Sequence, residues 1–152
     1  MKFEIPKPLQ VEHDELHATL VKATKAPGAV GEAAREVARL LHPHFVREEE
    51  FALPPLALLS ELARSGATPQ MAEVLPMTRR LKAELPAMLT EHKEIVGALD
   101  KLRAAAAAAG LPEYERFAEA LTLHAQTEEE VLYPAAILIG EHVAHKLAKV
   151  NP

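Results

Sequence analysis

Two copies of one short pattern hold the residues of this sequence that are best suited to chemistry. His44 is followed four positions later by Glu48, and 80 positions further on His124 and Glu128 repeat the same spacing. A histidine and a glutamate at i and i+4 lie one turn apart on one helix face. Imidazole binds transition metals, and a carboxylate can bridge two ions about 3.5–4 Å apart. The repeated pair predicts a two-metal site.

A further histidine precedes each pair, inside a similar Glu-His sequence. His13 lies upstream of the first pair and His92, with an offset of 79 residues, upstream of the second. Two repeat halves, about 9–66 and 68–148, thus each supply two histidines and one glutamate. One buried His–Glu pair is usually only a hydrogen bond between core polar groups. Six such residues in register would cost several kcal/mol to bury without a metal ion, so the metal site is favoured.

Composition places the chain among soluble helical proteins. Its 152 residues are expected to form one domain, 1–152, and they are rich in alanine and leucine with 4% aromatic residues. The chain has no cysteine, which excludes disulfides and thiolate metal sites. Its net charge of −5 and the lack of a basic cluster exclude nucleic acid as an expected partner. No apolar stretch approaches a membrane span, and the cytoplasm is the expected location.

Prolines and glycines divide the sequence into helical pieces. Helices are expected at about 9–26, from there to about 51, and then at 56–64, 68–110, 112–132 and 135–150. On the second of these helices, and again 80 positions later, apolar residues recur at steps of three and four. The fold class predicted is all-α: an up-down-up-down four-helix bundle with a short C-terminal helix, built as two helical hairpins. Pro76 and Pro86 are expected to kink or break the third long helix.

The predicted ligands share their helix faces with apolar residues. The stripe on the second helix ends at Phe51, and the equivalent stripe 80 positions later ends at Val131. The ligands should therefore point into the bundle. Five apolar residues are expected to line a tight pocket around the metals: Phe45, Ile95, Leu99, Phe117 and Leu121.

This arrangement resembles the hemerythrin-like, or HHE cation-binding, family over about residues 9–148. The residues that carry the resemblance are His13, His44-x-x-x-Glu48, His92 and His124-x-x-x-Glu128. The resemblance implies a four-helix bundle holding two Fe ions, a non-haem di-iron centre with an oxo or hydroxo bridge. By position in the family, His13 and His44 would serve one iron, His92 and His124 the other, and Glu48 and Glu128 would bridge them.

The functions that the resemblance implies centre on small ligands. Family members bind O₂, respond to NO or peroxide, sense or store iron, or help repair damaged iron centres. We expect a di-iron protein that binds or reacts with O₂ or a related species. The alternative is a metal-stabilised sensor or interaction module, or an iron-storage or repair protein. Apart from the metals, no catalytic side chain is expected, and enzyme status stays open. The alanine-rich third helix and the apolar last helix are candidate surfaces for a protein partner, and the oligomeric state stays open.

The sequence departs from the oxygen carriers of the family at one position. Those carriers have two histidines one turn apart on the third helix, but here Val96 follows His92 by one turn. The extra histidine lies on the first helix instead, as His17, one turn after His13. His17 is a possible additional metal ligand, or else a supporting or core histidine.

Several neighbouring polar residues are expected to be solvated. His42, His142 and His145 fall outside the apolar stripes. The glutamates that follow each predicted bridge are also expected on a solvated face, although a shift of one residue would make Glu49 or Glu129 the ligand.

Two other metal-site patterns fit less well. The first-helix pair His13 and His17 has the spacing of zinc proteases, but Asp14 stands where that motif has glutamate. A ferritin-like oxidase would need Glu-x-x-His motifs on two core stripes, and those stripes carry His-x-x-x-Glu. A zinc-protease site would also leave the second half of the chain unexplained.

Overall fold

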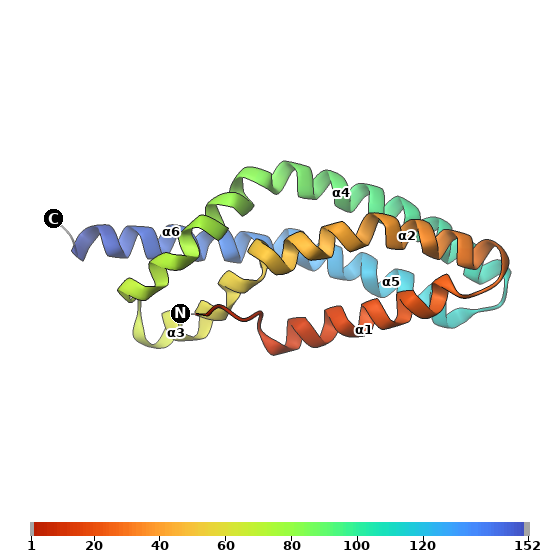
Figure 1. The fold of residues 1–152 in the computed structure, drawn as a ribbon, viewed down its shortest axis with the longest axis horizontal. Coiled ribbons are helices and arrows are strands. Elements are labelled where there is room, and N and C mark those ends of the chain that lie inside the picture. Colours follow the sequence, from red (N-terminus) through yellow and green to blue (C-terminus); the bar gives the residue numbers. More distant parts are fainter. Residues whose placement is uncertain (1, 151–152) are drawn as a thin grey trace.

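The computed structural model describes residues 2–150, and of the expected domain 1–152 residues 1, 151 and 152 lie outside this range. The described chain is helical and contains no strand. The four helices of the bundle are α1 (Lys7–Thr24), α2 (Gly28–Arg47), α4 (Leu75–Ala108) and α5 (Pro112–Thr127). They run up, down, up and down (Figure 1), so the predicted bundle is confirmed.

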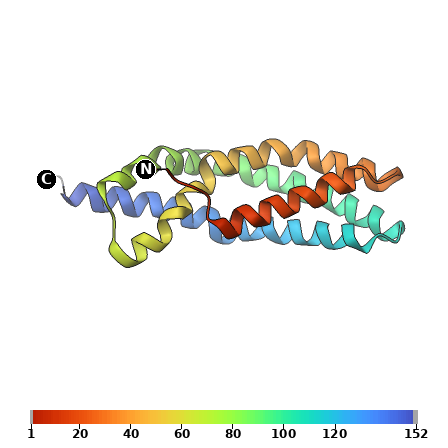
Figure 2. The ribbon, with the colours of Figure 1, turned by 60° about the horizontal axis from the view of Figure 1, so that its bottom comes forward.

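Shorter elements join and extend these helices. The π-helical segments η1 (Glu48–Ala52) and η4 (Glu128–Leu132) directly follow α2 and α5. The 3-10 segment η2 (Pro54–Leu58), the short helix α3 (Leu59–Ser65) and the 3-10 segment η3 (Pro69–Val74) link the hairpins. The last helix, α6 (Tyr133–Val150), follows η4 without a break. The linking segments and α6 extend beyond one end of the bundle (Figure 2).

The prolines of the third long helix act differently from each other. Pro76 lies at the start of α4, where a missing N–H leaves no bond unmade, so it neither kinks nor breaks the helix. Pro86 lies inside α4, and the helix bends within its green part in Figure 1 without breaking. At its other end α4 stops at Gly110, whose φ of +68° suits glycine.

Two apolar clusters fill the bundle, one on each side of the predicted ligands. The first includes Leu20, Val37, Leu102 and Phe117 and lies toward the α1–α2 and α4–α5 loops. The second lies toward the linking segments and is built largely by η1, η2, η3 and the helices α4 and α6. The five residues expected to line the metal pocket are all buried in the first cluster: Phe45, Ile95, Leu99, Phe117 and Leu121.

The end of one predicted stripe is wrong. Phe51 is buried in the second cluster with the Arg80 guanidinium 4.3 Å above its ring, but its counterpart Val131 is 56% exposed. The two halves differ here because the chain after η1 folds back through η2 and α3, whereas after η4 it continues directly as α6. None of the helices in the described part of the chain is long and apolar enough to cross a membrane.

Candidate metal centre

The six predicted ligands meet in the middle of the bundle. Each side chain is at most 5% exposed: His13, His44, Glu48, His92, His124 and Glu128. Along each helix they lie between residues of the two apolar clusters. Buried polar groups at this density need partners, so the arrangement of their ligand atoms decides what the centre can hold.

A π-helical segment begins at each of the two glutamates. In each segment a backbone N–H donates to the carbonyl five residues earlier, Leu53 to Glu48 and Tyr133 to Glu128. The next residue in each half is a proline, which has no N–H to donate and whose ring crowds the carbonyl four residues before it. The wider turn therefore recurs at the same place in both halves, as π-turns often do at functional sites.

One cluster of ligand atoms joins α2 to α4. The Nε2 atoms of His44 and His92 lie 2.8 Å apart. Glu48 Oε1 is 2.5 Å from His44 Nε2, and Glu128 Oε1 is 3.4 Å from His92 Nε2. Ligands about 2.0–2.2 Å from one ion lie about 3.0–3.5 Å from each other, so these separations suit a single metal ion.

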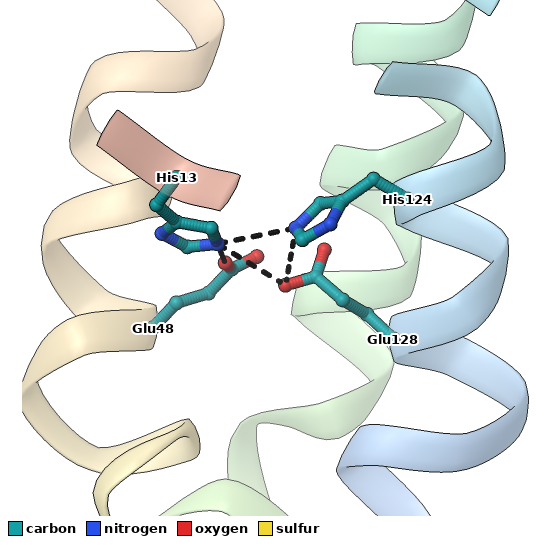
Figure 3. A group of neighbouring side chains, drawn as sticks. All are labelled: His13, Glu48, His124 and Glu128. Carbon is teal, nitrogen blue, oxygen red and sulfur yellow. Dashed lines mark hydrogen bonds and ion pairs between the residues drawn. The ribbon is translucent and has the colours of Figure 1, made fainter. Parts of the chain in front are cut away.

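The second cluster joins α1 to α5 (Figure 3). The Nε2 atoms of His13 and His124 lie 3.1 Å apart. Glu48 Oε2 is 3.3 Å from His13 Nε2, and Glu128 Oε2 is 3.4 Å from His124 Nε2. This second set of four atoms has the same composition as the first.

Both carboxylates are shared between the clusters. Each presents Oε1 to the His44–His92 pair and Oε2 to the His13–His124 pair. The two Oε2 atoms, of Glu48 and Glu128, are buried and accept no hydrogen bond. Unsatisfied buried carboxylate oxygens are costly, and a cation bound beside each would satisfy them. The residues thus fit two metal ions bridged by two carboxylates.

The pairing of histidines implied by family position is wrong. His13 pairs with His124, and His44 with His92, so each cluster takes one histidine from each repeat half. The reason is the packing of the hairpins: at this level α1 faces α5, and α2 faces α4, across the bundle. Only the carboxylates link the two clusters.

The structure does not bring His17 to the centre. The buried stripe of α1 passes through His13, Leu16, Leu20 and Ala23, which leaves His17 at its exposed edge. His17 belongs to neither cluster, and its role as an additional ligand is not supported. The centre has four histidines rather than five.

An outer ring of carboxylates surrounds the histidines. Each imidazole turns Nε2 inward and pairs Nδ1 with a glutamate of a neighbouring helix or segment. These pairs are His13 with Glu49 (3.3 Å), His44 with Glu91 (2.6 Å), His92 with Glu129 (3.0 Å) and His124 with Glu12. A carboxylate can only accept, so Nδ1–H donates, and Nε2 is the nitrogen left in the centre for a metal ion or a proton. Such partners fix the tautomer and orientation of metal-bound histidines.

Protons compete with metal for these nitrogens. Burial lowers the pKa of His92, but its bonds with Glu128 and Glu48 outweigh burial and raise the pKa to about 10. The pKa of His124 rises to about 9, because Glu128 in the same way outweighs burial. The pKa values of His13 and His44 are also raised, against burial, chiefly by Glu48. Metal binding must therefore displace protons.

Tyr133 adds a hydroxyl to one side of the centre. Its side chain is fully buried at the start of α6, and the hydroxyl donates to Glu48 Oε1 at 2.7 Å. Burial and the charge of Glu48 raise the pKa of Tyr133, so the phenol is protonated beside the carboxylates.

Some of the glutamates around the histidines belong to repeated sequence patterns. Glu12 and Glu91 were visible as a repeated Glu-His sequence, yet nothing in it gave their role. Glu49 and Glu129 are partly exposed, as expected for a solvated face, but they also hold histidines. No repeated sequence pattern indicates a role for Tyr133. The remaining histidines, His42, His142 and His145, are exposed as predicted.

A groove between α1 and α5 reaches the second cluster. Its volume is about 550 Å³, and the buried ligand His124 forms part of its wall. Other wall residues are Glu12, Glu15, Leu16, Phe117 and Leu123. This side of the centre therefore lies next to an opening at the surface.

Comparison with known proteins agrees with the geometry. Residues 5–136, and again residues 83–150, match the hemerythrin HHE cation-binding domain. The two overlapping matches both include His92, His124 and Glu128. No curated protein and no solved structure gives a significant match. A match over nearly the whole chain, together with the paired His/Glu clusters, shows that the chain belongs to the hemerythrin HHE cation-binding family.

Proposed function

We propose that this protein holds two iron ions and uses them to react with, or to sense, O₂ or a related small species such as peroxide or NO. The observation that supports this most directly is the sharing of both carboxylates by two His₂ clusters. Nitrogen and carboxylate ligands without thiolate suit iron, and a carboxylate-bridged pair suits two ions at short separation. When bound, the iron pair would supply electrons and a coordination position for the small ligand.

The residues around the centre have three roles in this proposal. The four histidines and Glu48 and Glu128 bind the ions, and the outer glutamates orient the histidines. The Phe45 ring stacks on the His13 ring, with 4.1 Å between the ring centroids. Together with the rest of the first apolar cluster, it keeps bulk water out. The closely packed core favours diatomic-sized ligands over bulky organic substrates.

Reaction or sensing is favoured over reversible oxygen carriage. His17 is exposed, and Val96 stands where the carriers have a second histidine on the third helix. With four histidines, the centre lacks the fifth nitrogen ligand of the carrier pattern.

Metal analysis of protein expressed with added iron tests the proposal. We expect two irons per chain and the near-ultraviolet absorption of a ferric pair. One metal per chain, or zinc alone despite iron supplementation, would contradict it. The reduced protein should then be titrated with O₂ in a closed cell. Conversion to a stable oxidised spectrum is expected, whereas a spectrum that returns to the reduced form when O₂ is removed would show carriage instead.

A further inference from the structure

The two halves of the centre differ at one buried position. Tyr133 follows Glu128 by five residues, and the equivalent residue after Glu48 is Leu53. Both side chains are buried, at 0% and 1% exposure. The repeat therefore supplies a hydroxyl in the second half and only a hydrocarbon in the first. This group makes the surroundings of the two clusters different.

The hydroxyl lies among the ligand atoms of one cluster only. Tyr133 Oη is 2.7 Å from Glu48 Oε1, 3.2 Å from His92 Nε2 and 3.4 Å from His44 Nε2. The three ligand atoms themselves are separated by 2.5, 2.8 and 3.7 Å. The four atoms thus surround one point, with separations like those between ligands of one ion.

The phenol oxygen keeps lone pairs that can bind a cation. The phenol has one proton, which it donates to Glu48 Oε1, yet its oxygen also lies near two imidazole nitrogens. In the metal-free form a protonated imidazole can donate to the phenol oxygen, and once metal ions replace those protons the Nε2 lone pairs and the phenol oxygen face the same point. The ring cannot turn away, because it is enclosed in the second apolar cluster and packs 5.6 Å from the His92 ring.

We propose that the Tyr133 oxygen is a seventh protein ligand, bound to the ion held by His44 and His92. This inference rests on the proposed di-iron function. Tyrosine oxygen is an established ligand of ferric iron in other proteins. On binding, the oxygen–metal bond forms and the phenol proton, now donated to Glu48, is released to solvent. The metal ions balance the negative charge that the phenolate adds.

The same asymmetry assigns different roles to the two ions. The ion held by His44 and His92 gains the tyrosine oxygen and loses a free position. Across the centre, His13 has the apolar ring of Phe45 stacked against it, and the groove between α1 and α5 reaches His124. The exchangeable position, where a small ligand binds, therefore belongs to the ion held by His13 and His124.

Spectroscopy of the iron-loaded protein tests the tyrosine ligand. The chain has two tyrosines, so Tyr133→Phe and the control Tyr114→Phe remove one each. Tyr114 is buried in the first apolar cluster and contacts none of the ligands in the described interactions. We expect a visible tyrosinate-to-iron absorption band, with resonance Raman tyrosinate modes, in the ferric wild type and in Tyr114→Phe. Both signals should be lost in Tyr133→Phe.

Metal content separates this proposal from the one on which it rests. Two irons per chain without tyrosinate modes in the wild type would overturn the tyrosine ligand and leave the di-iron function intact. Persistence of the band in Tyr133→Phe would overturn it as well. A wild type that binds no iron would overturn both. If Tyr133→Phe fails to fold, wild type labelled with ring-deuterated tyrosine decides, because ligation requires the Raman modes to shift with the label.

Discussion

Glu48 and Glu128 occupy equivalent positions in the repeat, but their pKa values shift in opposite directions. Burial raises the pKa of both carboxyls. Bonds with His13, His44 and His92 outweigh burial at Glu48 and hold its pKa well below the usual range. At Glu128, burial and the charge of Glu48 raise the pKa. Glu48 is therefore the permanent negative charge of the centre, whereas burial and the neighbouring Glu48 disfavour the charged form of Glu128.

Removing the permanent charge should affect both metal positions. Because Glu48 gives one oxygen to each cluster, Glu48→Ala should reduce metal occupancy at both rather than at one. We expect fewer than one metal per chain by elemental analysis under conditions that load two into the wild type. Glu50→Ala, in the same π-helical segment but exposed and paired with Arg80, is the matched control and should keep two. Loss of a single metal from Glu48→Ala would contradict the bridging geometry.

The outer carboxylates should tune affinity without being ligands. Glu91 accepts from His44 and pairs with Arg47, so Glu91→Gln keeps an acceptor but removes its charge. Metal affinity should fall about 10–100-fold, as for other partners of metal-bound histidines. Competition with a chromophoric chelator measures the change. The exposed Glu94 on the same helix provides the control, Glu94→Gln, and equal effects of both would show that only overall charge matters.

The six inner residues could be predicted from the sequence because their spacing repeats and metal chemistry restricts their types. The partners of the histidines could not be predicted in the same way. A glutamate that follows another glutamate looks like a solvated residue, and Glu129 reaches His92 only because helices distant in sequence pack together. Tyr133 breaks the repeat instead of following it, so a search for repeated positions passes over it.

At the scale of elements, the π-helical segments connect the repeat to the metal geometry. Each starts at a glutamate shared by the two clusters and ends two residues before a proline. A π-turn contains one residue more than an α-turn. In a regular α-helix the residues beyond the glutamate would therefore point about 100° away from their present direction. The segment η4 therefore decides where Tyr133 points.

Replacing Pro134 should disturb this geometry. Pro134→Ala restores an N–H that can donate to the carbonyl four residues earlier, which favours a regular α-helix over η4. We expect metal affinity to fall by about 10-fold or more, as for other changes in ligand orientation. Far-ultraviolet circular dichroism should stay unchanged. Pro112→Ala, at the first turn of α5, is the control. Unchanged metal binding in Pro134→Ala would mean that core packing alone holds η4.

Helix positions could be predicted within a few residues, but their continuity could not. Pro134 indicated the start of a separate short helix, whereas α6 has 18 residues and continues from η4. A proline near a π-turn is accommodated by the wider turn, so it does not end the helix. The inward stripe predicted to reach Val131 stops earlier, because the chain after η4 continues as α6 and does not fold back as it does after η1.

At the scale of the whole molecule, the bundle has apolar cores on both sides of the metals. Since neither core depends on a metal ligand, the chain treated with a chelator should remain folded. Far-ultraviolet circular dichroism should change little, and the unfolding midpoint should drop. Saturating metal at 100 times its Kd should add about 2.7 kcal/mol to the free energy of unfolding. Loss of helical signal on chelation would show that the metals are needed for folding.

The metal-free and metal-loaded forms should respond to pH in opposite directions. In the metal-free form the folded-state pKa of His92 is about 10 and that of His124 about 9, above the unfolded value near 6.5. Their stabilising contribution is therefore complete below about pH 6.5 and is lost as pH rises through 9 to 10. In the metal-loaded form, falling pH returns protons to the same Nε2 atoms and releases the ions, so stability falls toward acid. Urea unfolding at pH 6, 7.5 and 9, with metal and with chelator, measures both trends. Parallel curves would contradict a centre in which protons and metal ions occupy the same nitrogens.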